Sequence, residues 1–195
     1  MRCQKKKRKR YGGGQDRRGQ MPNIRRIDER PAHIESRSQV GHWEADTVIG
    51  KNHQQAIVTL VERKSGYALI EKVENKTAEL VSQAIIGMLG KISIRVKTIT
   101  FDNGKEFAWH EKIATTLKCK TYFAQPYQSW QRGSNENYNG LLRQYIPQSR
   151  LLLNVEKQEL KMIEKRLNAR PRKRLEYKSP SQIFTASLRR VALHA

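Results

Sequence analysis

The sequence predicts an α/β domain built on a mixed five-stranded sheet with helices on its faces. Three apolar, strand-like segments follow one another between residues 43 and 73. After them, segments with a helical repeat alternate with strand-like segments as far as residue 123. A meander of strands that continues into strand–helix alternation is typical of a mixed sheet that is covered by helices.

Five segments have the composition of strands, with many β-branched and aromatic residues. The second of them is apolar almost throughout, which is typical of a strand that is covered on both faces. A turn at residues 63–66 connects this strand to the third one. The five expected strands are residues 43–49, 56–61, 67–73, 96–101 and 120–123.

A helical repeat first becomes visible after Thr77, which is a suitable N-cap residue. The apolar residues of this repeat end at Gly90, where we expect the helix to stop; they are Leu80, Val81, Ala84, Ile85, Met88 and Leu89. Further helices are expected at residues 107–117, 135–145 and 156–168, followed by a short last helix after Ser179-Pro180.

The charge of the chain is strongly positive. Thirty-nine Lys and Arg residues against eighteen Asp and Glu residues give a formal net charge of +21. Such an excess attracts polyanions at long range, so nucleic acid is the expected partner. An anionic membrane surface is the weaker alternative, because the sequence has no basic amphipathic helix with a broad apolar face. No apolar run has the length of a membrane span, and we expect no membrane partner.

Composition divides the chain into three parts. Residues 1–36 are expected to form a basic flexible arm, because the first thirty residues hold twelve Lys or Arg and offer almost nothing to bury. This arm could contact phosphates or could be only a solubilising tail. Residues 37–188 are expected to form the folded core, and residues 189–195 a short tail. Cys3 and Cys119 are expected to be free thiols in a reducing compartment.

Three carboxylates occupy separate predicted elements. Asp46 lies in the first strand, Asp102 ends the fourth strand, and Glu136 lies in the first turn of the third expected helix. The rules for connections permit the first and fourth strands to be neighbours, so the three acids can converge at one edge of the sheet. A simpler interpretation of Asp102 is a polar turn, since Asn103-Gly104 is a strong hairpin signal.

A cluster of acids within a basic chain fits metal-dependent phosphoryl transfer. Carboxylate oxygens are natural ligands of Mg²⁺ and Mn²⁺. Two such ions, about 3.5–4 Å apart, stabilise both the attacking and the leaving oxygen of the reaction. The sequence therefore predicts a site for two Mg²⁺ ions, with Mn²⁺ as a substitute, at Asp46, Asp102 and Glu136. Mutual repulsion should raise the pKa of at least one of these acids when no metal is bound.

Two more acids are secondary candidates. Glu44 lies two residues before Asp46 on the same side of the strand, so it could be a metal ligand or a partner of the ligands. Glu106 is expected to favour the N-terminus of a helix instead.

Residues near the acids are candidates for contact with nucleic acid. Arg143 follows Glu136 by two helical turns on the same face, where it could hold a phosphate or be only a solvated charge. Trp130 could stack on an unpaired base or anchor its own loop. The remaining candidates are Arg132, Asn135 and Asn137, which surround Glu136, and Lys105, which follows Asp102.

Several motifs carry these residues. They are Gly41-His42-Trp43-Glu44-Ala45-Asp46-Thr47-Val48-Ile49-Gly50, Lys97-Thr98-Ile99-Thr100-Phe101-Asp102-Asn103-Gly104-Lys105-Glu106-Phe107 and Pro126-Tyr127-Gln128-Ser129-Trp130-Gln131-Arg132-Gly133-Ser134-Asn135-Glu136-Asn137. Asn168-Ala169-Arg170-Pro171-Arg172 and Ser179-Pro180 come later in the chain. With these motifs, residues 27–184 resemble the transposases of the insertion sequence 30 family. Glu136 follows Asp102 by 34 positions (136 − 102 = 34), which is the spacing of that family.

The resemblance implies a ribonuclease-H-like fold, as in retroviral integrases, and a D-D-E catalytic core. In this core Asp46, Asp102 and Glu136 bind two magnesium ions. The implied reaction is polynucleotidyl transfer, in which a water or a 3′-hydroxyl attacks a phosphodiester of double-stranded DNA, first at the element ends and then in the target. The resemblance also implies a homo-oligomer on DNA, in the cytoplasm of a bacterium and associated with its nucleoid.

The sequence also departs from the family pattern. Full-length members carry a helix-turn-helix region ahead of the core, whereas only about thirty residues, twelve of them Lys or Arg, precede it here, so we expect a truncated or split gene product. Ala45 and Glu176 stand where glycine is usual, and Glu176 is expected to strain a turn. We interpret the chain as a transposase catalytic core. The alternatives are a catalytically inactive basic DNA-binding remnant, which would not bind metal, and a ribonuclease-H-like nuclease, which would cleave without joining strands.

Overall fold

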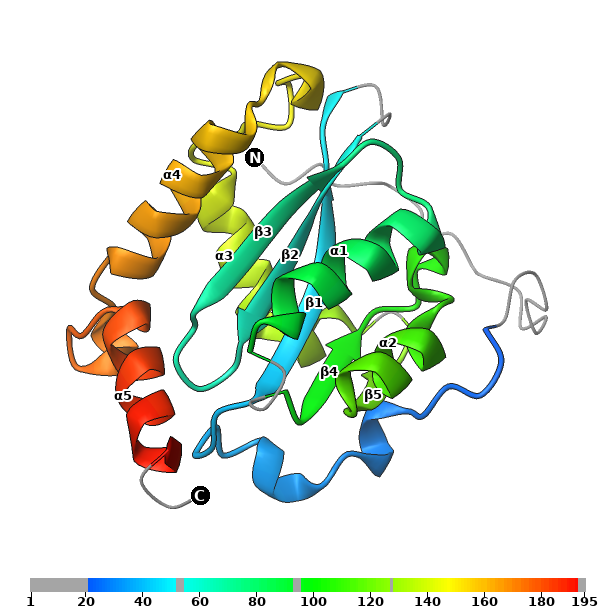
Figure 1. The fold of residues 1–195 in the computed structure, drawn as a ribbon, viewed down its shortest axis with the longest axis vertical. Helices are drawn as coiled ribbons and strands as arrows, with labels where there is room; N and C mark the ends of the chain where they lie inside the picture. The colour runs from blue at the N-terminus through cyan, green and yellow to red at the C-terminus, as the bar shows by residue number, and fades with distance from the viewer. Residues whose placement is uncertain (1–20, 52–54, 93–95, 127, 193–195) are drawn as a thin grey trace, which may run out of the picture.

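The computed structural model describes residues 21–51, 55–92, 96–126 and 128–192. Figure 1 shows a central mixed sheet of five strands, whose order is β3-β2-β1-β4-β5. An antiparallel meander is formed by β1 (His42–Ile49), β2 (Ala56–Glu62) and β3 (Ala68–Val73). The sheet continues from β1 through two parallel strands, β4 (Thr98–Phe101) and β5 (Lys120–Phe123). The mixed sheet expected from the sequence is therefore confirmed, with β1 and β4 as neighbours.

Helices cover both faces of this sheet (Figure 1). The helices on one face are α1 (Ala78–Gly90) and α2 (His110–Leu117), and those on the other face are α3 (Gly133–Leu142) and α4 (Lys157–Ala169). The last helix, α5 (Pro180–Ala192), contributes Phe184 to the core beneath α1. Short 3-10 helices form several of the connections, at Ile27–Glu29, Ala32–Ile34, Lys105–Phe107, Ser129–Arg132, Leu152–Asn154 and Lys173–Leu175.

The helix boundaries agree with the sequence for α1 and differ for α3 and α5. The side chain of Thr77 caps α1 by accepting from the Leu80 amide at 3.3 Å, and Gly90 ends the helix. In contrast, α3 begins and ends earlier than the expected 135–145, because Ile146 turns back into the core and Pro147 disfavours a helical residue before it. The last helix is longer than expected, since α5 includes residues 189–192 of the predicted tail.

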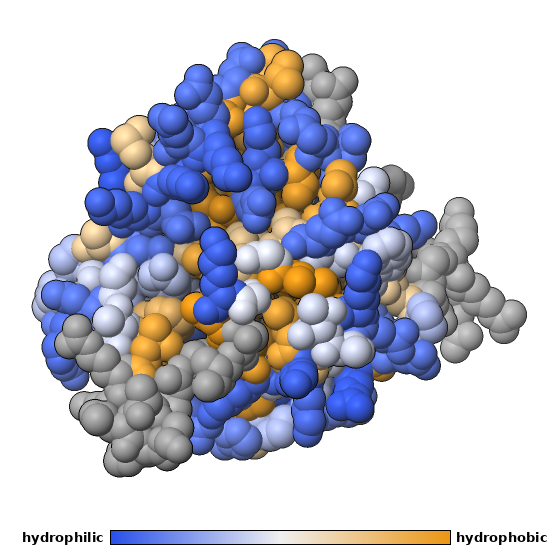
Figure 2. Space-filling view, in the orientation of Figure 1, coloured by the Kyte–Doolittle hydropathy of each residue, from blue (hydrophilic) through white to orange (hydrophobic). Residues whose placement is uncertain are grey.

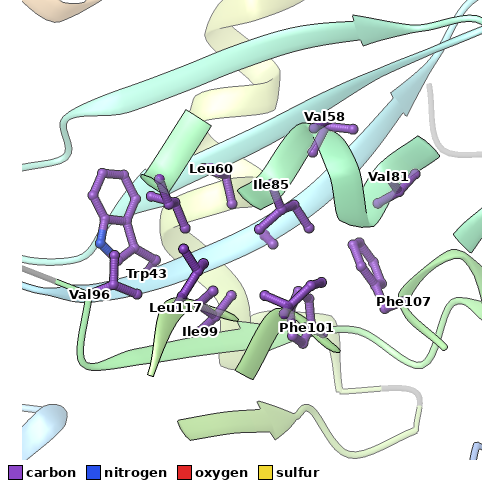
Figure 3. Packing of buried hydrophobic residues seen from close by; sticks show 14 of the residues in the cluster. Trp43, Val58, Leu60, Val81, Ile85, Val96, Ile99, Phe101, Phe107 and Leu117 are labelled. Carbon is purple, nitrogen blue, oxygen red and sulfur yellow. The ribbon is translucent and has the colours of Figure 1, made fainter. Parts of the chain in front are cut away.

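The first core lies between the sheet and the pair α1 and α2. Figure 3 shows Trp43, Leu60 and Ile99 from three strands packing against Ile85 of α1, and Phe101 beside Phe107. These side chains are fully buried. Burial of each such side chain contributes roughly 1.5–3 kcal/mol, so the end of β4, where Asp102 follows Phe101, is firmly held.

The second core lies on the opposite face and holds α3 against the sheet. Tyr138 and Leu142 of α3 pack with Ile57 and Val61 of β2, and Leu167 of α4 joins them. As predicted from its apolar sequence, β2 is buried on both faces along its whole length. Apolar packing therefore fixes the position of α3 along the sheet. The polar side chains of α3 are thereby held next to β1, the central strand.

The prediction of a flexible arm is wrong for residues 21–36. Ile27 and Ile34 are buried in this segment, and the Phe123 amide donates to the Arg25 carbonyl at 2.8 Å, which adds the segment to the edge of β5. Arg30 is also buried and donates to the Thr100 hydroxyl at 3.0 Å. The high charge of the segment conceals a few apolar residues that are sufficient to attach it. Residues 1–20, including Cys3, lie outside the described part of the chain.

The surface agrees with a chain that is rich in charge. On the face shown in Figure 2, hydrophilic residues cover most of the surface and apolar residues show between them. Within the described ranges, no helix combines the length and the hydropathy needed to cross a bilayer. Cys119 is a free cysteine, as predicted, and burial raises the pKa of its thiol to about 12.

Candidate active site

The parallel pairing of β1 and β4 places Asp46 and Asp102 at the same level. The register of the two strands aligns Glu44 with Thr100, and two positions further along each chain come the two aspartates. Asp102 lies just beyond the last residue of β4, where the strands diverge and the carboxylate is accessible. The structure thus brings together two of the three acids that the sequence singled out.

Arg132 lies between these two carboxylates. Its Nη1 is 3.3 Å from Oδ2 of Asp46, and its Nη2 is 3.4 Å from Oδ2 of Asp102. Nη1 also donates to the Ala45 carbonyl at 3.3 Å. Arg132 is the N-cap residue of α3 and is only 9% exposed, so the start of this helix positions the guanidinium. Both ion-pair distances exceed the 2.7–2.9 Å that is usual for charge-assisted hydrogen bonds, which indicates a loose pairing.

A second residue of α3 orients Asp46. The Nδ2 of Asn139 donates to Oδ2 of Asp46 at 3.0 Å, and the Oδ1 of Asn139 accepts from the Thr59 hydroxyl at 3.1 Å. The other carboxylate oxygen of Asp46 accepts from the Thr47 amide at 2.8 Å. Sequence reasoning missed Asn139. The available signal was its position three residues after Glu136, on the same helical face.

Burial raises the pKa of Asp102 above its usual range. The guanidinium of Arg132 and the Gly104 amide, which donates to Oδ1 at 2.9 Å, both oppose this rise. The charges of Asp46 and Glu106 add to it. The prediction that one of the acids has a raised pKa is confirmed, although the main cause is loss of hydration and not repulsion between acids.

Glu106 is a further acid beside the site. It is 7% exposed, accepts from the Thr47 hydroxyl at 3.0 Å, and forms an ion pair with Lys76 at 2.7 Å. As expected, it lies in the first turn of a short helix, here Lys105–Phe107. The charge of the same carboxylate also acts on Asp102, which the sequence analysis did not predict.

Glu136 lies in the first turn of α3 and is exposed. Its helical position falls between Arg132 and Asn139, which both contact Asp46, so this face of α3 is turned toward the aspartates. Within the described part of the chain, however, no three Asp, Glu, His or Cys side chains are gathered closely enough to hold a metal ion. The role of Glu136 as a third ligand stays a prediction.

The donor atoms of Asp46 and Asp102 fit a hard divalent cation. Each directs one carboxylate oxygen at the same positively charged group, the guanidinium of Arg132. Carboxylate oxygens are the ligands that Mg²⁺ and Mn²⁺ prefer. A cation bound by both oxygens would take the place of this guanidinium, so Arg132 must move when metal binds.

Glu44 is a partner of the site and not a part of its accessible surface. Its carboxylate is completely buried, pairs with Nε of Arg63 at 3.1 Å and accepts from the Asn135 amide at 3.1 Å. The sequence left open whether Glu44 binds metal or supports the ligands. Its partners favour the second role, because it anchors the start of α3 beside Asp46.

The predicted nucleic-acid contacts fall into different environments. Lys105 is exposed three positions after Asp102, and Asn137 is exposed directly after Glu136. A nucleic acid could reach both side chains. Asn135 is completely buried, which disfavours a direct contact with nucleic acid, so its role stays a prediction. Neighbouring positions on α3 thus differ, with Asn137 exposed and Asn135 buried. The side chain of Trp130 lies outside the described part of the structure.

Arg143 is bonded to the backbone of β1 and is not a free surface charge. Its Nη2 donates to the Ile49 carbonyl at 2.7 Å, and its Nη1 is buried without a hydrogen-bond partner among the described residues. Burial lowers the pKa of this guanidinium. Arg143 therefore ties the end of α3 to the end of β1, and its contact with a phosphate stays a prediction.

Comparison with known proteins agrees with this geometry. Residues 37–129 match the family model described as an integrase core domain. This range contains Asp46 and Asp102, and Glu136 lies beyond it. The chain is also similar to the solved catalytic core domain of BIV integrase, with a TM-score of 0.61, 21% identity, and coverage of 78% of this chain and 98% of that one. The expected ribonuclease-H-like, integrase-core fold is confirmed.

Curated relatives are transposases of bacterial insertion sequences. The chain is 47% identical over 167 residues to the transposase of insertion sequence element IS4351 from Bacteroides fragilis, which covers 86% of this chain and 51% of the relative. It is 37% identical over 181 residues to the transposase InsI of element IS30A from Escherichia coli K12, covering 90% of this chain and 47% of the relative. The chain thus spans about half the length of these relatives, and the predicted resemblance to the insertion sequence 30 family is confirmed.

Proposed function

We propose that this chain, which carries an integrase core domain and resembles insertion-sequence transposases, catalyses DNA strand cleavage and strand transfer with divalent metal ions. The observation that carries the proposal is the pair Asp46 and Asp102. These acids come from two parallel neighbouring strands, lie at one level, and face the same cationic group. Such a pair on this fold is suited to hold metal against a phosphodiester.

Asp46 and Asp102 would hold the metal ions, with Glu136 as the third ligand from α3. Bound Mg²⁺ supplies charge stabilisation for the attacking and leaving oxygens of the phosphodiester. The chain itself supplies orientation. Asn139 and the Thr47 amide fix the carboxylate of Asp46, and the Gly104 amide fixes that of Asp102. Mutation of residues that orient metal ligands in this way commonly reduces metal affinity or activity by about 10–100-fold.

The positive charge of the chain supports double-stranded DNA as the substrate. A formal charge of +21 favours association with polyphosphate and makes it dependent on salt. As the family resemblance implies, we propose that the chain acts as a homo-oligomer on element ends and target DNA, in the bacterial cytoplasm on the nucleoid. The chain spans about half the length of the relatives named above.

The test is a strand-joining assay with a pre-cut DNA duplex and a plasmid target, in Mg²⁺ and in Mn²⁺. Wild type is compared with Glu136→Gln, Asp102→Asn and the control Glu79→Gln. Glu79 is the exposed first-turn acid of α1, as Glu136 is that of α3, so the control makes the same charge change away from the site. We expect joined products with wild type and Glu79→Gln, and a loss of at least 100-fold with the two site variants.

Each other outcome of these assays indicates a different function of the chain or a different composition of its site. Intact, salt-sensitive DNA binding without joining or cleavage in either metal would indicate an inactive DNA-binding chain. Cleavage without joining would indicate a ribonuclease-H-like nuclease. Activity retained by Glu136→Gln but lost in Asp102→Asn would exclude Glu136 from the site while keeping the aspartate pair.

A further inference from the structure

A polar cavity of about 270 Å³ lies beside the first turn of α3, next to the candidate active site. Gly133 and Ser134 line it, and they follow Arg132 directly in the chain. The motif Asn168–Arg172, which has no role in the metal site, reaches the same cavity through Arg172. At the start of this motif, Asn168 exchanges two hydrogen bonds with the backbone of Ala68, which fixes the segment to β3.

Three arginines line this cavity, namely Arg37, Arg172 and Arg174. None of its lining residues in the described chain is acidic, and none of the three arginines forms an ion pair there. Burial lowers the pKa of Arg174, the charges of Arg37 and Arg172 lower it further, and the charges of Glu62 and Glu44 oppose this decrease. Three like charges without an ion-pair partner among the described residues are unfavourable together, which points to an anionic ligand.

Among the described residues, the guanidiniums of Arg172 and Arg174 donate only to backbone carbonyls. Arg172 donates to the Leu167 carbonyl at 3.2 Å, and Arg174 donates to the Lys64 carbonyl at 3.2 Å. The Nε of Arg172 is buried and has no hydrogen-bond partner within the same ranges. Each guanidinium has five N–H donors, so most of the donors of these two remain available to a ligand.

Two buried hydroxyl groups also line the cavity. Ser134 is 9% exposed and Tyr138 is 1% exposed, and neither hydroxyl has a hydrogen-bond partner in the part of the chain that the structure describes. A buried hydroxyl without a partner is costly to the fold, so such groups usually serve a ligand or hold water. Ser134 also lies in the first turn of α3, whose N-terminus favours negative charge.

Gly66, in the turn between β2 and β3, also lines the cavity. Its φ is +69°, a conformation that favours glycine, and a Cβ at this position would lie 2.3 Å from Nη2 of Arg174. The absence of a side chain therefore lets the Arg174 guanidinium lie directly over the backbone of the β2–β3 turn. This turn, the start of α3 and the segment after α4 all converge on the cavity.

We propose that this arginine cavity binds a backbone phosphate of DNA. Planar guanidiniums, hydroxyl donors and a helix N-terminus together match the oxygens of a phosphate group. The proposal rests on the proposed function for the choice of DNA, since the cavity adjoins the residue that touches both catalytic aspartates. A strand held there has its next contacts at Asn137, which also lines the cavity, and at the metal site.

The test measures affinity for a short DNA duplex against salt concentration, without divalent metal. Wild type is compared with Arg37→Gln/Arg174→Gln and with Lys173→Gln/Lys178→Gln. The second variant removes the same charge from exposed residues of the same surface that do not line the cavity. Loss of one phosphate contact should reduce the slope of log K against log salt by about 0.9. We expect this change for the arginine variant and a clearly smaller one for the lysine variant.

Two further measurements distinguish binding at this cavity from non-specific electrostatic attraction of DNA by the basic surface. Ser134→Ala keeps the charge and removes a buried hydroxyl that has no partner, so it should leave the salt slope unchanged, should not lower the melting temperature, and should weaken DNA binding several-fold. Inorganic phosphate should raise the melting temperature of wild type above that in chloride at equal ionic strength, but not that of the arginine variant. Equal slopes for the two double variants would overturn the proposal. Phosphate stabilisation without any arginine-specific change in DNA binding would instead assign the cavity to free phosphate.

None of these measurements depends on strand transfer. If the joining assay fails while the arginine variant changes the salt slope as expected, the cavity is a DNA site in a chain that is not a transposase. If joining succeeds and the slopes are equal, the proposed function stands and the cavity proposal is wrong.

Discussion

The side-chain amide of Asn139 donates to Oδ2 of Asp46 at 3.0 Å and thereby joins the middle of α3 to the middle of β1. The same amide group accepts from the buried hydroxyl of Thr59 on β2, so its orientation is fixed by two strands. This relationship makes Asn139 a positioning residue for the carboxylate that is expected to bind metal.

Asn139→Ala should reduce strand joining by about 10–100-fold while lowering the free energy of unfolding by only about 1 kcal/mol. The loss of activity follows from a carboxylate that is no longer held in one orientation. The loss of stability is small because the Thr47 amide and Arg132 still bind Asp46. Joining assays in a Mg²⁺ titration, together with urea unfolding, measure both effects.

Thr59→Val is the matched control for Asn139→Ala. It removes the hydroxyl that donates to Asn139 and leaves the contact between Asn139 and Asp46 in place. Its activity should fall less than that of Asn139→Ala at every Mg²⁺ concentration. If the two variants lose activity equally, the contact with Asp46 is not the important one.

Arg132→Gln should lower the melting temperature without metal and increase the stabilisation that Mg²⁺ provides. Two carboxylates that face one guanidinium lose their shared counter-charge in this variant. We expect a loss of about 1–2 kcal/mol, because both aspartates are partly exposed and the pairing is loose. Mg²⁺ then relieves a larger repulsion than in wild type, and thermal melting with and without the metal measures this difference.

Arg150→Gln is the charge-matched control for Arg132→Gln. Arg150 pairs with Glu159 at 2.6 Å, away from the two aspartates. The melting temperature of the Arg150→Gln variant should respond to Mg²⁺ as that of wild type does. An unchanged response in Arg132→Gln would mean that the guanidinium does not compete with metal for the aspartates.

The meander, the later strands and the place of Asp102 at the rim of the sheet could be predicted from the sequence, whereas the pairing of the first and fourth strands was only permitted by the rules for connections. Apolar runs determine the strands, and a carboxylate at the end of the run before Asp102 has to lie at the rim of the sheet. The attachment of residues 21–36 could not be predicted. A dense series of charges conceals Ile27 and Ile34, and their burial depends on the far edge of β5, which only tertiary structure provides.

The neighbourhood of Glu136 shows a different limit. The sequence marked Asn135 and Asn137 as similar polar residues, yet Asn135 is buried, with its backbone amide donating to Glu44, and Asn137 is exposed. This difference depends on the rotation of α3, which Tyr138 and Leu142 set from the second core. The position of Arg132 between the aspartates likewise follows from the entry angle of α3, which no local pattern encodes.

Glu176→Gly should stabilise the chain by about 0.5–1 kcal/mol. The sequence predicted strain at this position, and the structure places Glu176 at φ 54° and ψ 42°, a left-handed conformation that costs other residues about 1 kcal/mol or more. Glycine adopts it freely but adds entropy to the unfolded chain, so only part of the strain is recovered. Urea unfolding of the variant and of wild type measures the difference.

Glu176→Ala separates backbone strain from charge. It removes the exposed carboxylate, whose pairing with Lys178 at 3.6 Å is weak, and keeps the Cβ that opposes a positive φ. This variant should show no gain in stability. A gain equal to that of Glu176→Gly would assign the effect to the charge of Glu176 and not to its backbone conformation.

Acid should destabilise the chain through His42. Burial is the main cause that lowers the pKa of this imidazole from 6.5 to about 4, and the positive charges of Lys97, His33, Arg63 and Arg30 contribute to the same decrease. The unfolded chain therefore binds the proton more readily than the folded chain between these two values, and stability falls as the pH drops from about 6.5 toward 4. At pH 5 the expected loss is about 2 kcal/mol relative to pH 7.5.

His42→Asn should remove most of this acid dependence, because an amide does not titrate and can still bond to the Thr98 hydroxyl, which lies 2.9 Å from Nδ1 of His42. His33→Asn is the control, since it removes an exposed neighbouring histidine and leaves His42 in place. Urea unfolding at pH 7.5 and pH 5 should give a difference of about 2 kcal/mol for wild type and His33→Asn, and a much smaller one for His42→Asn. An equal acid loss in all three proteins would show that other groups, and not His42, take up the proton on unfolding.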